Sequence, residues 1–381
     1  MSNKSLAKSP ADTTILVTGG AGFIGTHTCV ELLDAGYRIV VVDNFSNSCE
    51  TALERVRTIC GLSADDERMK FYQDDILDRE ALDTIFAEND IDAIIHFAGF
   101  KAVGESVRKP LEYYWNNIVG TLTLCDVARS HDVKNIVFSS SATVYGEPDI
   151  VPITEDCAKH DPFSPYAWTK SMLEQMLTDL YVGDNEWNVV LLRYFNPIGA
   201  HESGLIGEDP KGIPNNLVPY VAKVAVGKLD CVGVFGDDYP TPDGTGVRDY
   251  IHVVDLARGH VAALNWMGGK VGSGKAIGRG SIEGTPAEDG TRRGVGIFNL
   301  GTGKGSSVFD VIHSFERACG HKIPYVIKPR RPGDIASYYA SSDKARDEMG
   351  WVAEYDLDRM CADSWRWQSM NPDGYATAGE A

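Results

Sequence analysis

Short apolar runs alternate with amphipathic stretches through the first half of the chain. The apolar runs cover residues 15–18, 39–43, 70–73, 93–97, 135–138 and 189–193. Between them lie segments with helical spacing of apolar positions, such as 26–35, which Gly36 closes, and 111–130. Buried strands that alternate with helices are typical of a parallel sheet covered on both faces. The pattern predicts an α/β fold built on a Rossmann-type, doubly wound parallel sheet.

The composition of the chain changes after Asn196 and Pro197. Glycine and proline become more frequent there, and predicted loops separate shorter elements. We therefore predict a first domain over 14–190 and a smaller α/β domain over 191–370, with part of 248–267 returning to the first. Residues 1–13 form a polar N-terminal extension. Residues 268–296 are rich in glycine and mixed in charge, which predicts a flexible insertion.

A glycine-rich turn, Thr18-Gly-Gly-Ala-Gly-Phe-Ile-Gly25, lies between the first predicted strand and the first predicted helix. Glycines allow such a turn to approach a pyrophosphate, whose charge meets the N-terminus of the following helix. Asp43 ends the next strand, 18 residues beyond Gly25, where its carboxylate can accept hydrogen bonds from a ribose and repel a 2′-phosphate. The motif therefore predicts a dinucleotide site that favours NAD over NADP.

Residues at the ends of the predicted strands extend this site. Asp75 and Ile76 are placed to meet the adenine, and the segment 97–101 ends the following strand at the edge expected for the cofactor. The cofactor residues predicted on these grounds are Gly19, Gly22, Phe23, Ile24, Gly25, Asp43, Asn44, Asp75, Ile76, Phe97, Ala98, Gly99 and Lys101.

Tyr166 and Lys170 are the candidate catalytic pair. They stand four residues apart, so on a helix they share one face, and Pro165 suits the first turn of that helix. A free tyrosine has a pKa of about 10, but a nearby ammonium and a positive nicotinamide both favour the phenolate, which can then accept a proton. A run of serines at 139–141 ends a predicted strand. Ser141 is the candidate for holding the substrate oxygen, whereas the first two serines need only satisfy backbone groups.

Composition narrows the function further. The chain carries 54 acidic against 36 basic residues, a net charge of −18, and no cluster of lysine and arginine, so we expect no nucleic-acid partner. Eight cysteines without a C-x-x-C pair predict reduced thiols and a cytoplasmic protein. The nine histidines lack ligand spacing, so no metal is expected, and neither a secretory signal nor a membrane span is predicted.

These residues resemble the extended branch of the short-chain dehydrogenase/reductase superfamily. Over roughly residues 14–370 the chain is similar to the UDP-glucose 4-epimerase family within it. The similarity rests on the segments 97–106, 139–146, 192–197, 212–217 and 244–252.

The resemblance implies interconversion of UDP-galactose and UDP-glucose in galactose metabolism, by oxidation at C4, rotation of the 4-keto sugar and re-reduction. Tyr166 would take the proton of the 4-hydroxyl, Ser141 would position the 4-oxygen, and Lys170 would hold the nicotinamide ribose. A homodimer built from the helices 121–130 and 166–181 is also implied. The further cofactor residues that it implies are Asn47, Ser48, Asn116 and Phe195.

The UDP-sugar site is likewise implied by the resemblance. Its residues would be Asn196, Asn216, Leu217, Val234, Phe235, Arg248, Arg331, Asp334 and Tyr338. Guanidinium forks suit a diphosphate. Tyr338 falls where members of the family set the width of the sugar pocket, so an N-acetylated sugar would be disfavoured.

Three alternatives stay open at this stage. A 4,6-dehydratase of the same superfamily would need an acid–base pair where Ala142 and Thr143 stand, and neither side chain transfers protons readily. A UDP-pentose 4-epimerase is a second alternative. A non-catalytic NAD-sensing protein is the third, although it would not need Tyr166, Lys170 and Ser141 together.

Overall fold

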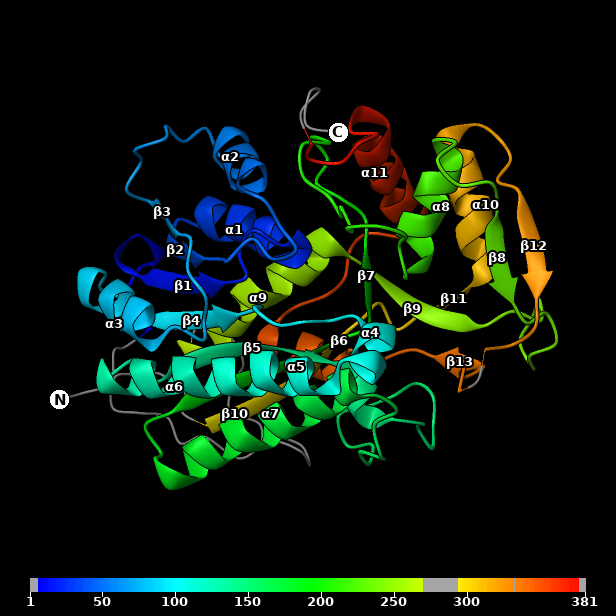
Figure 1. The fold of residues 1–381 in the computed structure, drawn as a ribbon. Helices are drawn as coiled ribbons and strands as arrows, with labels where there is room; N and C mark the ends of the chain where they lie inside the picture. Colours follow the sequence, from blue (N-terminus) through cyan, green and yellow to red (C-terminus); the bar gives the residue numbers. More distant parts are fainter. Residues whose placement is uncertain (1–5, 270–293, 332, 377–381) are drawn as a thin grey trace.

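A seven-stranded parallel sheet forms the centre of the molecule (Figure 1). The computed structural model describes residues 6–269, 294–331 and 333–376. In spatial order the strands are β10 (Gly294–Leu300), β6 (Asn188–Tyr194), β5 (Asn135–Ser141), β4 (Ala93–His96), β1 (Thr14–Thr18), β2 (Arg38–Val42) and β3 (Met69–Tyr72). The predicted parallel sheet is confirmed.

Side chains of each strand alternate between two apolar layers, because successive residues of a strand point to opposite faces. Ile15 and Val17 of β1 face the layer that contains α1 and α9, whereas Leu16 faces the layer that contains α6 and α7. Figure 1 shows the helices on both sides of the sheet. These helices are α1 (Phe23–Asp34), α2 (Glu50–Ile59) and α9 (Val253–Met267) on one face, and α3 (Arg79–Glu88), α6 (Gly120–Ser130) and α7 (Pro165–Gly183) on the other.

Strand β10 corrects one boundary of the predicted insertion. Residues 294–296 belong to this buried strand, which pairs with β6, and not to a loop. Glycines hide the strand pattern in the sequence, yet Gly296 has a packing role: a Cβ there would lie 2.8 Å from the rings of Phe298 and Trp266. Residues 270–293 lie outside the described part of the chain, so the flexible insertion stays a prediction.

The described part of the N-terminal extension packs against the sheet domain. Leu6 is buried, Pro10–Asp12 forms a 3₁₀ turn (η1), and Lys8 pairs with the buried Asp92 at 2.7 Å. This ion pair joins the extension to the residue directly before β4. Asp92 also accepts a hydrogen bond from the backbone amide of Thr14, so it links the extension to the start of β1 as well.

The remaining elements form a smaller lobe and the connections around the site. The lobe has its own apolar core, between a parallel pair of strands and three helices. Its strands are β7 (Asn196–Ile198), β8 (Val232–Phe235), β9 (Val247–His252), β11 (Gly305–Ser307), β12 (Tyr325–Lys328) and β13 (Ser337–Tyr338), and its helices are α8 (Leu217–Ala225), α10 (Val308–Cys319) and α11 (Leu357–Met370). The connecting helices and turns are α4 (Val103–Arg108), α5 (Pro110–Tyr114), η2 (Trp115–Val119), η3 (Ala142–Tyr145) and η4 (Ala345–Met349).

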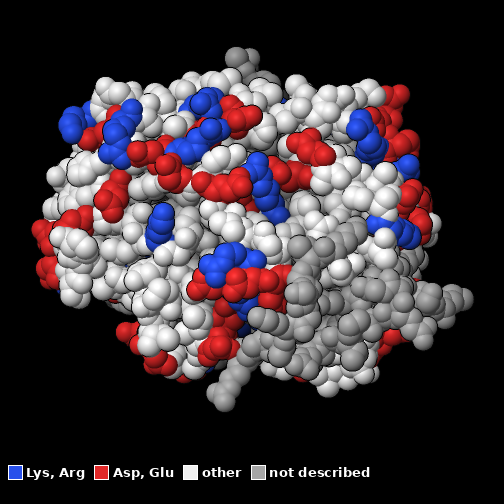
Figure 2. All heavy atoms as spheres, turned by 180° about the vertical axis from the view of Figure 1, so that it is seen from behind, with Lys and Arg blue, Asp and Glu red and all other residues white. Residues whose placement is uncertain are grey.

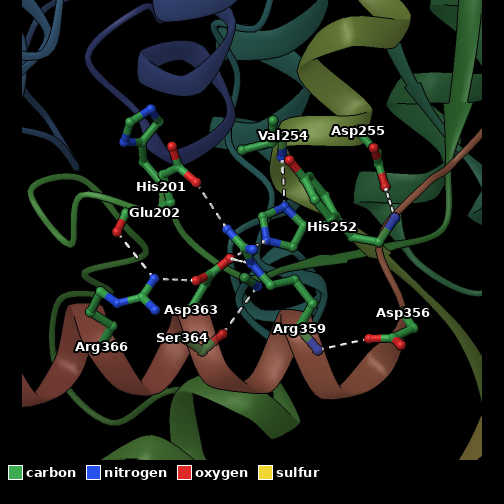
Figure 3. A network of polar contacts seen from close by, with 12 residues as sticks. His201, Glu202, His252, Val254, Asp255, Asp356, Arg359, Asp363, Ser364 and Arg366 are labelled. Carbon is green, nitrogen blue, oxygen red and sulfur yellow. Dashed lines mark hydrogen bonds and ion pairs between the residues drawn. The ribbon is translucent and has the colours of Figure 1, made fainter.

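A buried carboxylate fastens α11 to the end of β9 (Figure 3). Asp363 is 1% exposed, and its oxygens lie 3.2 Å from Nε2 of His252 and 2.5 Å from Nε of Arg359. Arg366 also pairs with it and reaches the carbonyl of Glu202. Burial acts to raise the pKa of Asp363, but His252 and Arg359 outweigh it and the pKa is lowered. Asp363 is therefore a charged anchor, fully surrounded by donors.

The outer surface mixes charges of both signs. On the face seen in Figure 2, acidic and basic side chains lie beside one another. Since the net charge is −18, the overall field disfavours an anionic ligand, which must depend on arginines placed locally. Among the described residues, no helix has both the length and the apolar character that crossing a bilayer requires.

Candidate active site

The glycine turn joins β1 to α1 with little space for side chains. Gly19 has φ +70°, and a Cβ there would lie 2.7 Å from the backbone nitrogen of Ala98. A Cβ at Gly25 would lie 2.4 Å from the carbonyl oxygen of Gly19. Gly22 differs, because a Cβ there would meet only one atom, at 3.3 Å, and no side chain caps the helix that it begins. The first turn of α1 therefore lacks a side-chain cap and has room beside Gly22, which fits the pyrophosphate of a dinucleotide.

Asp43 follows β2 and is held beside this turn. Its Oδ2 accepts the backbone amide of Ala21 at 3.0 Å, and its Oδ1 accepts Phe45 and the hydroxyl of Ser48. Three donors orient the carboxylate at the edge of the sheet where β1 ends. Asp43 and Ser48 thus lie together, as the predicted cofactor site requires, whereas Asn47 is exposed.

The other predicted cofactor residues line the same edge of the sheet. Asn44 donates to Asp75 at 2.8 Å, and Asp75 also caps its own turn through Leu77. Ile76 is buried. Beyond β4, the backbone amides of Phe97 and Ala98 both reach the carbonyl of Thr18, so this segment lies directly beside the glycine turn. Within the predicted set, Phe23, Ile24, Gly99 and Asn116 are partly buried and Lys101 is exposed, 3.4 Å from Glu208.

Asn117 is a residue that the sequence reasoning missed. It is buried in the π-helical turn η2, accepts the amide of Phe100 at 2.8 Å and donates to Thr169 of α7 at 3.1 Å. It therefore joins the loop after β4 to the helix that carries Tyr166. The π turn is a signal only in structure, since π-bulges often mark functional sites but leave no trace in hydrophobic pattern.

Tyr166, Lys170 and Ser141 meet where β5 ends and α7 begins. The hydroxyl of Ser164 caps α7 and Pro165 occupies its first turn, which directs Tyr166 toward the strand end. Tyr166 is partly buried, and loss of water around its hydroxyl raises the pKa, whereas a side-chain hydrogen bond with Ser141 acts to lower it. Ser141 in turn accepts the hydroxyl of Thr143 at 3.0 Å.

Lys170 is almost fully buried, at 6% exposed. Its ammonium donates to the carbonyl of Ser139 at 2.5 Å and lies 4.7 Å from the centroid of the Phe138 ring. Burial lowers the pKa of Lys170 to about 7, while Glu174 acts to raise it. An amine whose pKa lies near neutrality, one helical turn after a tyrosine, is typical of a proton-transfer site.

In the smaller lobe, Arg248 lies within a cluster of polar groups. Its guanidinium donates to the carbonyls of Val247 and Ile335 and to Asp334 at 2.9 Å. Arg331 is 58% exposed, lies 3.4 Å from the same carboxylate and stacks 4.4 Å above the ring of Phe235. The structure therefore brings together the three charged residues of the predicted UDP site.

The uncharged members of that predicted site are more dispersed. Asn196 donates to the carbonyl of Asp249, and Asn216 and Leu217 begin α8, where Asn216 is exposed. Val234 is fully buried in the core of the lobe, so only its main chain is available to a ligand.

Tyr338 connects the lobe to the catalytic strand end. Its hydroxyl donates to the carbonyl of Ala142 at 2.5 Å, directly after Ser141, and its ring lies 5.8 Å from that of Phe195. It also pairs through its backbone with Arg248. Tyr338 therefore stands between the tyrosine–lysine pair and the arginine cluster.

No group of three or more histidine, cysteine, aspartate or glutamate side chains is arranged to hold a metal ion among the described residues. All eight cysteines lie in the described part of the chain, and none is paired in a disulfide.

Comparison with known proteins agrees with this geometry. The sequence model of the NAD dependent epimerase/dehydratase family matches residues 15–273. A UDP-glucose 4-epimerase of Bacillus subtilis (strain 168) is 57% identical over 364 residues, which are 96% of this chain and 99% of the relative.

Solved structures extend the similarity to the fold. The UDP-glucose 4-epimerase of Bifidobacterium longum, in complex with NAD+ and UDP, is 56% identical with a TM-score of 0.84, over 95% of this chain and 100% of that one. That of Stenotrophomonas maltophila, with NAD and formylated UDP-arabinopyranose, is 45% identical with a TM-score of 0.85, over 94% and 99%. The fold is thus of the Rossmann type, and the chain belongs to the NAD dependent epimerase/dehydratase family, among its UDP-glucose 4-epimerases.

Proposed function

We propose that Tyr166, Lys170 and Ser141 carry out the proton transfer of a UDP-glucose 4-epimerase, which interconverts UDP-glucose and UDP-galactose with NAD as its cofactor. The single observation that carries this proposal is the nearly buried ammonium of Lys170 on the carbonyl of Ser139, one helical turn after Tyr166 and at the carboxyl edge of a dinucleotide-type sheet. Ligands of open α/β sheets bind at this edge.

Each side chain has a distinct part. Tyr166 accepts the proton of the sugar 4-hydroxyl and later returns one, as its position beside a serine hydroxyl allows. Ser141 positions the 4-oxygen. Lys170 is held by the carbonyl of Ser139, where its positive charge favours the phenolate and its amine is available to a ribose. When bound beside the glycine turn and Asp43, NAD would supply the acceptor for the C4 hydride and the donor that returns it to the opposite face of the rotated 4-keto sugar.

The two arginines of the smaller lobe bind the diphosphate. Arg248 and Arg331 present guanidinium groups on either side of Asp334, and guanidinium forks match phosphate oxygens. Because the overall charge of the chain is negative, these local cations supply the attraction that the surface does not.

The residues after Ser141 argue against elimination of water. Ala142 is buried, and the hydroxyl of Thr143 is engaged with Ser141. A 4,6-dehydratase would require an acid and a base in these places, so epimerisation is the reaction that the site supports.

A homodimer that forms through α6 and α7 is the assembly we propose. A surface hollow between these helices is lined mainly by apolar side chains, including the exposed Leu122 and the partly buried Met176. Apolar faces of this kind are covered in oligomers. Sedimentation of the purified protein tests the assembly, and a monomer at micromolar concentration would contradict it.

A cytoplasmic location is part of the proposal, because eight unpaired cysteines suit a reducing compartment. Localisation of the tagged chain in intact cells is the corresponding test.

The decisive test of function is a coupled assay with purified protein. UDP-galactose is supplied without added NAD, and the appearance of UDP-glucose is measured. We expect turnover, together with release of NAD when the protein is denatured. A protein that turns over UDP-galactose yet contains no nicotinamide dinucleotide would refute the proposed role of the glycine turn.

A further inference from the structure

Three consecutive serines, 139–141, end β5, and each meets a different side chain of α7. The hydroxyl of the third interacts with Tyr166, and the carbonyl of the first accepts the ammonium of Lys170. The hydroxyl of the second donates to Oε1 of Glu174 at 2.6 Å. The three residues of α7 are spaced by four, so they lie along one face of the helix. The first two have a place in the proposed reaction, and the third so far has none.

Glu174 is a buried carboxylate with every oxygen engaged. It is 2% exposed, and Arg193 contacts both oxygens, at 2.9 and 2.7 Å. Lys159 adds a third charged donor at 3.2 Å. Burial acts to raise the pKa of Glu174, but Arg193, Lys159 and Ser140 outweigh it and the pKa is lowered. The carboxylate is therefore ionised, one helical turn beyond Lys170.

We propose that Glu174 is a positioning residue of the epimerase reaction, which keeps Lys170 protonated through its negative charge and fixes the end of β5 through Ser140. The inference rests on the proposed role of Lys170. The contacts of Glu174 are with Ser140, Arg193 and Lys159, and none of these residues belongs to the proposed reacting groups or cofactor residues. Glu174 therefore acts through Lys170 and through β5.

The groups around Lys170 make this charge decisive. On α7 the charge of Glu174 acts on it and Tyr166 lies one helical turn before it on the same face, and on β5 it meets the carbonyl of Ser139 and the ring of Phe138. From β4, the nearby group is His96. Burial lowers the pKa of His96 to about 3, so it is neutral at working pH. Glu174 thus supplies the negative charge among these groups.

The direction of the effect follows from the pKa of Lys170. Burial lowers this pKa to about 7, and Glu174 opposes the fall. If Glu174 is neutralised, the pKa falls further, and the positive Arg193 left behind adds repulsion. A reaction that needs the protonated lysine would then lose rate at a lower pH.

The experiment measures kcat against pH for UDP-galactose with purified holoenzyme. In Glu174→Gln, we expect the alkaline limb of the profile to move to lower pH by about one unit. Lys159→Met removes a cation from the other side of the carboxylate, so its alkaline limb should move to higher pH. That shift should be smaller, since Lys159 is partly exposed.

Two control variants distinguish the action of Glu174 on Lys170 and β5 from a general contribution to stability. Ser140→Ala keeps the charge of Glu174 and removes its bond to the strand, so kcat should fall while the limb stays in place. Asp363→Asn removes another buried carboxylate held by arginines, far from β5 in the chain, and should lower thermal stability without moving the limb.

Several results would overturn the inference. An unmoved limb in Glu174→Gln, or an equal shift in Asp363→Asn, would show that the charge does not act on Lys170. If Glu174→Gln does not fold, the Lys159→Met profile decides. An alkaline limb that does not move to higher pH in that variant would also show that the charge of Glu174 does not act on Lys170. Unchanged kcat in Ser140→Ala would refute the fixing of the strand. Lys170→Met tests the underlying function separately, because retained turnover there would remove the proposed role of the lysine itself.

Discussion

The catalytic cluster and the arginine cluster of the smaller lobe are built in opposite ways. Lys170 is nearly buried and bonded to a backbone carbonyl, on a strand end and a helix that the sheet holds in place. Arg248 and Arg331 lie in the lobe, partly or largely exposed, and bond mainly to Asp334 and to loop carbonyls. The difference teaches that the side chains we propose to react are positioned before a ligand arrives. The arginines we propose to bind the diphosphate instead have protein partners that a ligand can replace.

The strongest way to break this comparison is to remove the phenol of the catalytic cluster. We expect Tyr166→Phe to lower kcat by at least about a hundredfold, the low end of general acid–base contributions. The affinity for UDP should stay the same, because the phenol belongs to the other cluster. Steady-state kinetics and titration calorimetry with UDP measure the two quantities. Turnover within a factor of a few of the unmodified protein would assign the base to another group.

The arginine cluster should respond in the opposite sense. Arg248→Met removes the guanidinium that two carbonyls and Asp334 hold in place and that we propose to bind the diphosphate. We therefore expect UDP to bind about ten- to a hundredfold more weakly, the equivalent of about 1.5–3 kcal/mol. The value of kcat at saturating substrate should change by less than about threefold, because the reacting atoms are held elsewhere. A large fall in kcat with unchanged affinity would mean that the two clusters are not independent.

Tyr338 sharpens the comparison because it touches both clusters. We expect Tyr338→Cys to raise kcat/KM for UDP-N-acetylglucosamine by about tenfold relative to UDP-galactose, since overpacking a tight site costs about 1–3 kcal/mol. The kinetic constants of both sugars in both proteins provide the measurement. Equal efficiency of the two sugars in the unmodified protein, or an unchanged preference in the variant, would refute the idea of a gate.

Arg331→Met offers the smallest effect and a matched control for Arg248. Its side chain is 58% exposed and lies 3.4 Å from Asp334, so solvent screens its charge. We expect UDP binding to weaken by only about three- to fivefold, and to lose part of its dependence on salt. An effect as large as that of Arg248→Met would show that ligand binding buries this arginine.

The sequence reveals those features whose signal is local. The glycine turn, the acid after β2 and the spacing of Tyr166 and Lys170 are each contained in a short stretch, so strand ends and one helix face could be predicted from them. Gly296 helps to hide β10 in the sequence, because its place in the sheet depends on the rings packed against it. Glu174 and Asn117 could not be predicted as part of the site for the same reason. Their hydrogen-bond partners lie on other elements, and no sequence pattern links either residue to its partners.

The late position of β10 has a consequence for synthesis of the chain. When the ribosome has released residues up to Tyr194, six of the seven strands of the sheet are available, and β6 stands at the open side with its apolar row from Val189 to Leu192. The strand that covers it begins only at Gly294. An unpaired hydrophobic edge recruits other chains, so the nascent protein carries an exposed aggregation site until a further hundred residues have emerged.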